Sequence, residues 1–461
     1  MSTPSVTAPD AAAAPRVTAA REALLQRIAN MAGQCDRCGS CLPVCPLFEE
    51  TGRETASARG KVSLVRGLLE GAVSPAPDLF ARLDFCLQCR ACTNACPSKI
   101  RTDELVSLAK GQLAGVTGRP AMLRAVDGFL ARPKLVSLAG PLVRAYARSA
   151  IRPLAEKAVL KPVLHRLADV ADLLPGRRPF GGDNGRPNKG KTRSVGGSDR
   201  ARRSSAVPSR GKIRYLAGCF VRLSYPEVMR ATTATLRDAG YQVVVVDDAC
   251  CGLPHWSHGD LDRARNMAAS NLSRLSGPEL VVTDCASCGS ALMDYARWLA
   301  GSEHESAAKS LAARVRDVSV VLASLEPAPA APPAGSGSPE APERTKVTYH
   351  DPCHLSRGQG IKAQPRQVLC NAGYEVVEMK GADVCCGGSG TFCLEYQSDS
   401  QALLEKKTKN ILATGAEYVV TSCPSCLLQL EHGMKLFGDG KAVKVIHLTE
   451  AIQHSPVSDQ S

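Results

Sequence analysis

The chain contains one five-cysteine pattern twice, and this repeat constrains the fold more than any other feature. The second copy includes Cys385-Cys386-Gly387-Gly388, and the first includes Cys250-Cys251-Gly252. The offset between the copies runs from 134 (353 − 219) to 138 (426 − 288). Neighbouring thiols do not easily serve one tetrahedral zinc ion, but they can bind two irons of one cluster. Numbered after the two sites that precede them in the chain, these copies form a third and a fourth candidate site. The candidate ligands are Cys219, Cys250, Cys251, Cys285 and Cys288 at the third site, and Cys353, Cys385, Cys386, Cys423 and Cys426 at the fourth. The pattern predicts a duplicated iron–sulfur domain.

A second duplication precedes this one. The run C-x₂-C-x₂-C-x₃-C-P occurs at residues 35–46 and again at 86–97, an offset of 51 (86 − 35). This is the spacing of bacterial [4Fe–4S] ferredoxins, in which the fourth cysteine ligates the other cluster. The expected ligands are Cys35, Cys38, Cys41 and Cys96 for cluster 1, and Cys86, Cys89, Cys92 and Cys45 for cluster 2. Zinc knuckles are disfavoured because structural zinc usually takes two separated C-x-x-C pairs.

The cysteine content indicates metal binding rather than disulfides. The chain has 461 residues, enough for about three domains, and all but two of its 20 cysteines fall into short repeated motifs. Such spacings in a large chain point to metal ligation in a reducing compartment, so we expect a cytoplasmic protein. Residues 1–15 lack an apolar leader and no run of 18 apolar residues occurs, so no transmembrane segment is expected. The apolar run Leu135–Val143, with basic flanks, leaves open a peripheral contact with the inner face of the membrane.

The positive net charge belongs to one stretch. Of the net +13, residues 177–214 supply +10, from twelve Lys/Arg and two Asp, which leaves about +3 for the rest. Charge runs of this kind are usually solvated, so we do not expect a nucleic-acid partner or a scaffold role.

The hydrophobic pattern predicts a multidomain protein, in which an α-helical dicluster ferredoxin domain precedes two duplicated α/β cysteine-rich domains. In the C-terminal half, short β-rich runs end near cysteines and alternate with helices, which favours parallel sheets with ligands at the carboxyl ends of strands. The expected order is a disordered N-terminus (1–15), a ferredoxin-type domain (16–114), a helical connector (115–175), a basic disordered linker (176–211), a first cysteine-rich domain (212–325), a Pro/Ala linker (326–345) and a second cysteine-rich domain (346–461).

Glycines and histidines surround the cysteine pairs. We expect the glycines to take φ > 0 and let the backbone approach a cluster; these are Gly252, Gly387, Gly388 and Gly390. Four histidines, His255, His258, His350 and His354, either donate to cluster sulfur or are structural. Two cysteines lie outside every motif. Cys370 lies in an apolar helix and is expected to be a core residue, and Cys393 is not expected to be a ligand.

These motifs resemble a known family. The two ferredoxin-type runs, with Ser57-Ala58-Arg59-Gly60-Lys61 between them, are similar to the iron–sulfur subunits of glycolate oxidase, FAD-linked D-lactate dehydrogenase and anaerobic glycerol-3-phosphate dehydrogenase. Both five-cysteine copies resemble the family's "CCG" domain, which is also similar to the catalytic subunit of heterodisulfide reductase. The stretches His350-Asp351-Pro352-Cys353-His354, Gly387-Gly388-Ser389-Gly390-Thr391-Phe392 and Thr414-Gly415-Ala416 look most like the glycolate oxidase group.

The resemblance implies an electron-transfer subunit. A separate FAD-containing dehydrogenase subunit would oxidise a 2-hydroxyacid, and a quinone or another carrier would accept the electrons. The cofactors implied are two [4Fe–4S] cubanes plus one or two further [4Fe–4S] clusters, cubane or non-cubane, in the CCG domains. Some glycolate oxidase subunits have lost ligands in one copy, whereas both copies here keep all five cysteines. This retention leaves room for two clusters, as in heterodisulfide reductases, so a heterodisulfide-reductase-like catalytic role remains an alternative. Zinc in one copy is a further alternative, because four well-placed thiolates also suit zinc.

Overall fold

The computed structural model describes residues 13–132, Leu135, 209–246, 249–325, 344–440 and 443–455. The expected linkers at 176–211 and 326–345, the expected N-terminal segment and the apolar run after Leu135 lie mostly or wholly outside these residues. The chain forms two compact units, Met1–Ala121 with His255–Leu261, and Met122–Pro254 with Asp262–Ser461. Among the helices that could be assessed, none has the length and apolarity needed to cross a membrane.

The first unit is helical, as the sequence predicts. Its elements are α1 (Ala13–Gly33), α2 (Pro46–Thr51), the 3₁₀ helix η1 (Glu54–Ala56), α3 (Ala58–Leu69), α4 (Pro77–Asp84), α5 (Ala91–Ala95) and α6 (Thr102–Thr117); α7 (Ala121–Leu130) follows. Helix α3 begins where expected because the Ser57 hydroxyl accepts a hydrogen bond from the amide of Gly60 at 3.2 Å. Val62 and Val65 on this helix are buried in the core of the unit.

The second unit contains two four-stranded sheets, and every strand pair is parallel. The first has the order β2-β1-β3-β4 and the second has the matching order β6-β5-β7-β8. The strands are β1 (Lys212–Leu216), β2 (Gln242–Val246), β3 (Leu280–Thr283), β4 (Val315–Asp317), β5 (Lys346–Tyr349), β6 (Glu375–Val376), β7 (Tyr418–Thr421) and β8 (Lys444–His447). The duplication seen in the cysteines is therefore a duplication of fold.

Helices connect the strands in both copies. In the first copy they are α12 (Cys219–Ser224), α13 (Pro226–Asp238), α14 (Leu253–Ser257), α15 (Leu261–Arg274), α16 (Ala286–Trp298), α17 (Glu305–Arg314) and α18 (Val318–Ala323). In the second they are α19 (Cys353–Ser356), α20 (Ala363–Asn371), α21 (Phe392–Glu395), α22 (Gln397–Leu412), α23 (Pro424–Phe437) and α24 (Leu448–Gln453).

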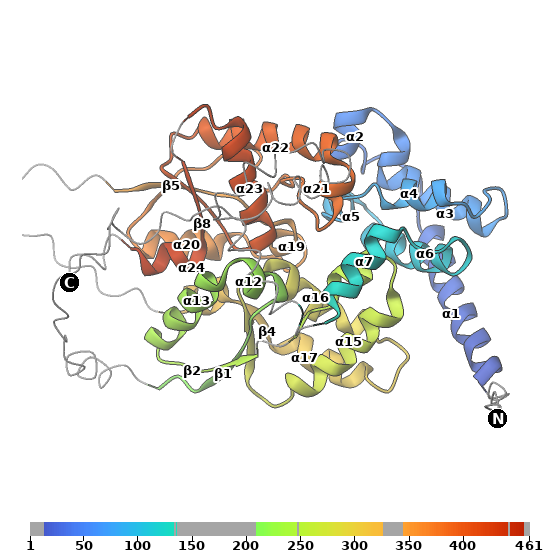
Figure 1. Ribbon diagram of the computed structural model, residues 1–461, viewed down its shortest axis with the longest axis horizontal. Coiled ribbons are helices and arrows are strands. Elements are labelled where there is room, and N and C mark those ends of the chain that lie inside the picture. Colours follow the sequence, from blue (N-terminus) through green and yellow to red (C-terminus); the bar gives the residue numbers. More distant parts are fainter. Residues whose placement is uncertain are drawn as a thin grey trace, which may run out of the picture. The chain divides into compact units, whose positions relative to one another are not determined.

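The two copies pack against each other reciprocally. Helix α13 packs on α24 (Figure 1). Its counterpart α20 packs on α18, the counterpart of α24. In the same way α16 packs on α19, while α23 packs on α12. Each contact thus occurs twice with the roles of the copies exchanged, as in the isologous interface of a two-fold dimer. A local two-fold relation follows from the duplication.

One hydrophobic core runs through this interface. It joins Ile213 and Leu236 of the first copy to Tyr349 and Leu448 of the second, all nearly inaccessible to solvent. Thr232 and Thr449 add a hydrogen bond between their hydroxyls at 3.0 Å. The copies therefore form one cooperative body.

We predict that Leu448→Ala destabilises the protein by about 2–5 kcal/mol, because it leaves a cavity in this shared core. The matched control is Leu436→Ala in the same copy, since Leu436 is 45% exposed; its effect should stay within about 0.5 kcal/mol. Urea denaturation of the intact chain under anaerobic conditions measures both free energies. Equal effects of the two substitutions would contradict a shared core.

Candidate metal centres

The two ferredoxin-type loops have the same unusual backbone. Arg37 and Gln88 occupy the same position of the first C-x-x-C in each run, and both have positive φ, 56° and 49°. Two residues later, Gly39 and Arg90 are also left-handed, with φ of 82° and 61°. Non-glycine residues rarely adopt this conformation, and it occurs where a chain must curl tightly. The loops therefore wind their cysteines around one point in each copy.

The four cysteines predicted for cluster 2 surround one cavity. Cys45, Cys86, Cys89 and Cys92 all line it, although Cys45 belongs to the other run. Burial, and secondarily the neighbouring Cys86, raises the pKa of Cys92 to about 12. A thiol with this environment ionises readily only when a metal takes the place of its proton. The donor set and the cavity fit a thiolate-bound cluster.

The cysteines predicted for cluster 1 lie nearer the surface. Cys38 is exposed, and Cys41 is close enough to Cys35 and Cys38 for their charges to raise its pKa, although burial is the larger cause. The fourth predicted ligand, Cys96, belongs to the other run. Ser98 connects the segment after it to this loop by a hydrogen bond to Asp36 at 3.1 Å. Cluster 1 would therefore be the more accessible of the two.

The motif between the runs serves both loops. A Cβ on Gly60 would lie 2.1 Å from the carbonyl oxygen of Glu54, so only glycine fits at this position. Arg59 pairs with Glu54 at 2.7 Å and faces the first loop, where Cys41 contributes to the raised pKa of Arg59 after Glu54. Lys61 is buried beside the cluster 2 cavity and donates to the carbonyls of Thr55 and Arg82 at 3.1 and 2.9 Å. The motif thus brings one cation to each loop.

The five-cysteine sites form at the carboxyl ends of the parallel strands, as predicted. In each copy the first cysteine begins a short helix (α12 or α19), and the fourth caps the helix after the third strand. Nine of these ten cysteines are buried, and Cys353 is half-buried. In the first copy the Sγ atoms of Cys219 and Cys250 are 3.6 Å apart. Local geometry therefore gathers the thiols predicted from spacing.

Glycine permits the turn after each cysteine pair. Gly252 and Gly387 have φ of 78° and 86°, and a Cβ at Gly387 would lie 2.8 Å from the carbonyl oxygen of Ser400. Gly390 also has positive φ. The prediction is wrong for Gly388, whose φ is not positive; a Cβ added there would instead lie 3.3 Å from the Cβ of Gln429.

The two five-cysteine sites adjoin each other at the local two-fold relation. Cys285 and Cys423, the fourth cysteine of each copy, are close enough for Cys285 to be the main cause that holds the pKa of Cys423 well below its usual value. Ser287 lies 3.6 Å from the Cys423 Sγ, and His354 Nδ1 lies 3.2 Å from the Ser287 hydroxyl. The amide of Ala286 donates to the carbonyl of Ser422 at 3.0 Å. The copies therefore build neighbouring sites rather than separate ones.

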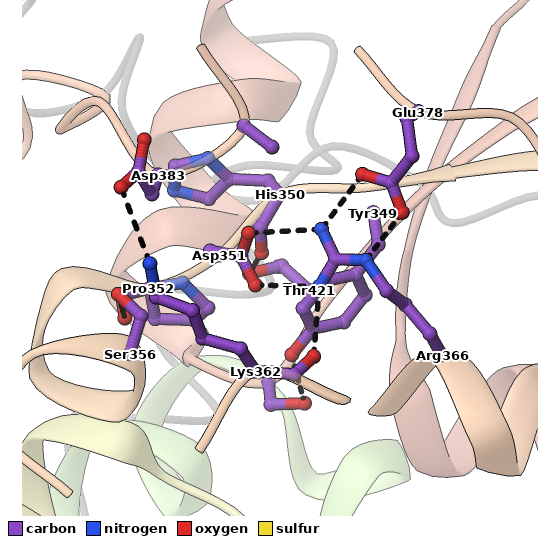
Figure 2. Close-up of polar contacts among 12 residues, drawn as sticks. Tyr349, His350, Asp351, Pro352, Ser356, Lys362, Arg366, Glu378, Asp383 and Thr421 are labelled. Atoms are coloured by element: carbon purple, nitrogen blue, oxygen red, sulfur yellow. Dashed lines mark hydrogen bonds and ion pairs between the residues drawn. The ribbon is translucent and has the colours of Figure 1, made fainter. Parts of the chain in front are cut away.

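His350 faces the second of these sites. It is fully buried, and neither ring nitrogen has a hydrogen-bond partner among the described residues. A ring nitrogen and the Sγ atoms of Cys386 and Cys426 lie within 4.8 Å of one another. Burial, with Lys407 as a second cause, lowers the pKa of His350 to about 3, so the ring is neutral. In Figure 2 the dashed lines that mark hydrogen bonds and ion pairs end on neighbouring side chains, and none ends on the His350 ring.

An ionic network, which the sequence did not reveal, holds the loop that carries His350. Figure 2 shows Arg366 between two carboxylates: its guanidinium donates to both oxygens of Asp351 at 2.8 and 2.9 Å and also pairs with Glu378. Lys362 pairs with Asp383 at 3.6 Å (Figure 2). Arg366 therefore balances the charge next to His350 and fixes the end of β5.

The remaining candidates have mixed outcomes. The prediction that Cys370 is a core residue is wrong: it is exposed, because α20 buries Val368 and Leu369 and turns the next position outward. Cys393 is half-buried, and its Sγ lies 3.5 Å from the carbonyl oxygen of Gly390. His255 and His258 are buried in the segment that belongs to the first unit.

Comparisons with known proteins match the parts of the chain that carry these cysteines. A model described as "Cysteine-rich domain" (CCG) matches residues 213–293 and 347–431, and one described as "4Fe-4S dicluster domain" matches 31–100. The chain is 28% identical over 430 residues to a "Probable glycolate oxidase iron-sulfur subunit" of Bacillus subtilis (strain 168), covering 91% of this chain and 92% of that protein. The chain is also similar to a "Glycolate oxidase iron-sulfur subunit" of Escherichia coli (strain K12), at 22% identity over 405 residues, 86% of this chain and 89% of that protein.

Two further relatives match about half of this chain. The B subunit of a fumarate reductase (CoM/CoB) from Methanothermobacter marburgensis is 32% identical over 244 residues, 52% of this chain and 46% of that protein. A "Lactate utilization protein A" of Geobacillus sp. (strain WCH70) is 28% identical over 244 residues, 52% of this chain and 98% of that protein. The homology supports an iron–sulfur electron-transfer role within an oxidoreductase.

We predict that Cys45→Ser removes cluster 2, although Cys45 lies in the run that supplies most of cluster 1. The iron content of the anaerobically prepared chain should fall by about four per chain, the content of one [4Fe–4S] cubane. Cys370→Ser is the matched control, because Cys370 is exposed and outside every motif. EPR spectra that show cluster 1 lost instead of cluster 2 would overturn the crossed ligand assignment.

Proposed function

We propose that the chain is the iron–sulfur subunit of a 2-hydroxyacid dehydrogenase of the glycolate or D-lactate type. A separate FAD-containing subunit would oxidise the substrate, and a quinone or another carrier would accept the electrons. The observation that carries the proposal is the cavity lined by Cys45, Cys86, Cys89 and Cys92, together with the mostly buried cysteines of the two five-cysteine sites. The names of the relatives, which refer to glycolate and lactate, indicate the substrate class.

We propose the following ligands. Cluster 1 would be held by Cys35, Cys38, Cys41 and Cys96, and cluster 2 by Cys86, Cys89, Cys92 and Cys45. The third and fourth sites would each take one [4Fe–4S] cluster through their five cysteines. Bound clusters would supply one-electron transfer, and the chain would tune it through burial, charge and hydrogen bonds.

Iron is favoured over zinc at the third and fourth sites. A structural zinc site is closed by four ligands, whereas each of these sites gathers five thiols, nine of the ten being buried. A fifth buried thiol would have no role at a tetrahedral ion. The adjacent pair in each copy, such as Cys250-Cys251, instead suits two irons of one cluster, and this holds equally for a non-cubane arrangement.

A contact within the first unit joins the cluster 2 loop to the segment His255–Leu261. Gln88, inside the cluster 2 loop, donates a hydrogen bond to the carbonyl of Ser257 at 3.2 Å. Ser257 follows Cys251 by six positions in the chain (257 − 251). Cluster 2 would therefore lie beside the segment that follows the first cysteine pair in the sequence, while the accessible cluster 1 would face the FAD subunit.

A disulfide reductase is the second candidate. The contact between Cys285 and Cys423 places two five-cysteine sites side by side, where the two halves of a disulfide could each be held. The relative whose name pairs CoM with CoB points in this direction. The chain's likeness to it is confined to 52% of its length, whereas the glycolate oxidase relative covers 91%.

We predict about sixteen irons per chain after anaerobic preparation, four for each of four [4Fe–4S] clusters. When the chain is assembled with its FAD partner, addition of glycolate or D-lactate should reduce the clusters, and EPR measures this reduction. Clusters that stay oxidised with both substrates, in a complex that contains FAD, would refute the dehydrogenase proposal. Cleavage of a disulfide by the isolated chain with a low-potential donor would favour the second candidate. In the metal analysis, about eight irons per chain plus zinc would make the third and fourth sites structural.

A further inference from the structure

The two five-cysteine sites are equivalent in fold but differ in the residues around them. Their equivalent positions follow from the glycine turns. A Cβ at Gly252 would meet the carbonyl oxygen of Ala264, and a Cβ at Gly387 would meet that of Ser400. The shift between these helix positions is 136 (400 − 264). The same shift relates Met267 of α15 to Leu403 of α22, whose Cβ atoms lie 3.5 and 3.4 Å from the Cβ positions built at Gly252 and Gly387.

This shift places Lys407 where the first copy has Asn271 (271 + 136 = 407). Asn271 is neutral and donates to the carbonyl of Cys250 and to the hydroxyl of Tyr295, both at 2.8 Å. Lys407 donates to the carbonyl of Gly381 at 2.6 Å, in the loop that leads into the second cysteine pair. Among the described residues of the second unit, Lys407 is the only buried lysine or arginine.

The residues at the ends of the equivalent strands β1 and β5 also differ, and the second copy has the polar residue. The first cysteines of the two copies are 134 apart (353 − 219), and this shift places His350 where the first copy has Leu216. Leu216 is buried and apolar, so it offers nothing to a cluster. His350 faces Cys386 and Cys426 with two buried ring nitrogens that have no partner among the described residues. A neutral imidazole has one N–H, which is available to a cluster sulfur.

The residue before the fourth cysteine differs as well. The first copy has Asp284 there, and the second has Ser422 (284 + 138 = 422). Asp284 is fully buried; its Oδ2 accepts hydrogen bonds from Tyr215 and Thr232, and its Oδ1 has no partner among the described residues. The first site thus gains a carboxylate, while the second gains a lysine and a histidine.

These differences act on reduction potential in one direction. Adding an electron to a cluster makes it more negative, so a nearby cation and N–H donors to sulfur stabilise the reduced form, while a nearby carboxylate destabilises it. Burial strengthens both effects because the local dielectric is low. We propose that the fourth site, at Cys353–Cys426, has the higher reduction potential of the adjoining pair and is the point from which electrons leave the chain.

Solvent access supports the second part of this proposal. Cys353 of the fourth site is half-buried, whereas all five cysteines of the third site are buried. Val384, directly before the cysteine pair of the fourth site, is 40% exposed. An external acceptor can therefore approach the fourth site more closely than the third.

In the step proposed, one electron would pass from a cluster held by the third-site cysteines to one held by the fourth-site cysteines; no bond or proton is transferred. The electron comes from the 2-hydroxyacid through the FAD subunit, so the physiological direction rests on the proposed function. The difference in potential is a property of this chain alone. It can be measured with a chemical reductant whatever the substrate is.

The experiment is an EPR-monitored redox titration of the full chain with its clusters, using dithionite. Lys407→Met removes the buried charge and keeps the length of the side chain. We expect the midpoint potential of the fourth-site cluster to fall by at least about 59 mV, a tenfold change for a one-electron couple. The third-site signal should not move. Lys409→Met is the matched control, because Lys409 is an exposed lysine two positions along the same helix.

Two further variants keep the test decisive if Lys407→Met fails to fold or to take up iron. Asn271→Lys transfers the cation to the third site and should raise its potential. His350→Leu copies the residue of the first copy and should lower the fourth-site potential with the iron content unchanged. Cys386→Ser and Cys251→Ser assign the two signals, since each removes one cluster.

Three results would overturn the proposal: a third-site potential at or above that of the fourth site, no shift in any of these variants, or zinc in either site. Loss of iron in His350→Leu would instead make His350 a ligand, which contradicts its role as a donor. If the potentials behave as expected but glycolate and D-lactate leave the clusters oxidised, the inference stands and the proposed function fails.

Discussion

The reciprocal packing of the two cysteine-rich copies is the interaction on which the rest of the second unit depends. Each copy alone would leave the apolar faces of two helices uncovered, those of α13 and α18 in the first and α20 and α24 in the second. Exchanging these contacts buries all four faces in one core. The same exchange pairs the helix that follows the fourth cysteine with the short helix that begins at the first cysteine of the other copy. Hydrophobic burial therefore decides which thiols become neighbours.

Much of the fold and of the candidate sites was predictable because it depends on the spacing of residues that are close together in the sequence. The cysteine runs, the glycine after each pair and the alternation of strands with helices depend on nearby residues, and parallel strands bring their carboxyl ends to one edge. The contact between Cys285 and Cys423 was not predictable. It depends on which apolar face of each copy meets the other, and residues such as Leu236 and Leu448 look like ordinary core residues in the sequence.

The same limit applies to single side chains on helices. Cys370 was expected in the core because its helix contains apolar residues, but the burial of α20 is confined to one face. Lys407 lies in a helix rich in lysine, where a charge usually indicates a solvated surface. Only the contact of α22 with the second glycine turn distinguishes it from Lys406 and Lys409. Burying an ammonium group costs several kcal/mol unless partners offset it, and the carbonyls of Gly381 and Ala382 provide that offset.

The short segment His255–Leu261 has a consequence for how this chain can be divided. It follows the first cysteine pair, yet it belongs to the compact unit formed mainly by residues up to Ala121. Leu261 fills the space beside Gly111, and Asp260 pairs with Arg119 at 2.8 Å. A single cut between the halves would take these residues from the first unit. The ferredoxin-like half and the cysteine-rich half are thus interleaved in sequence, and a gene fragment that ends near residue 121 encodes an incomplete module.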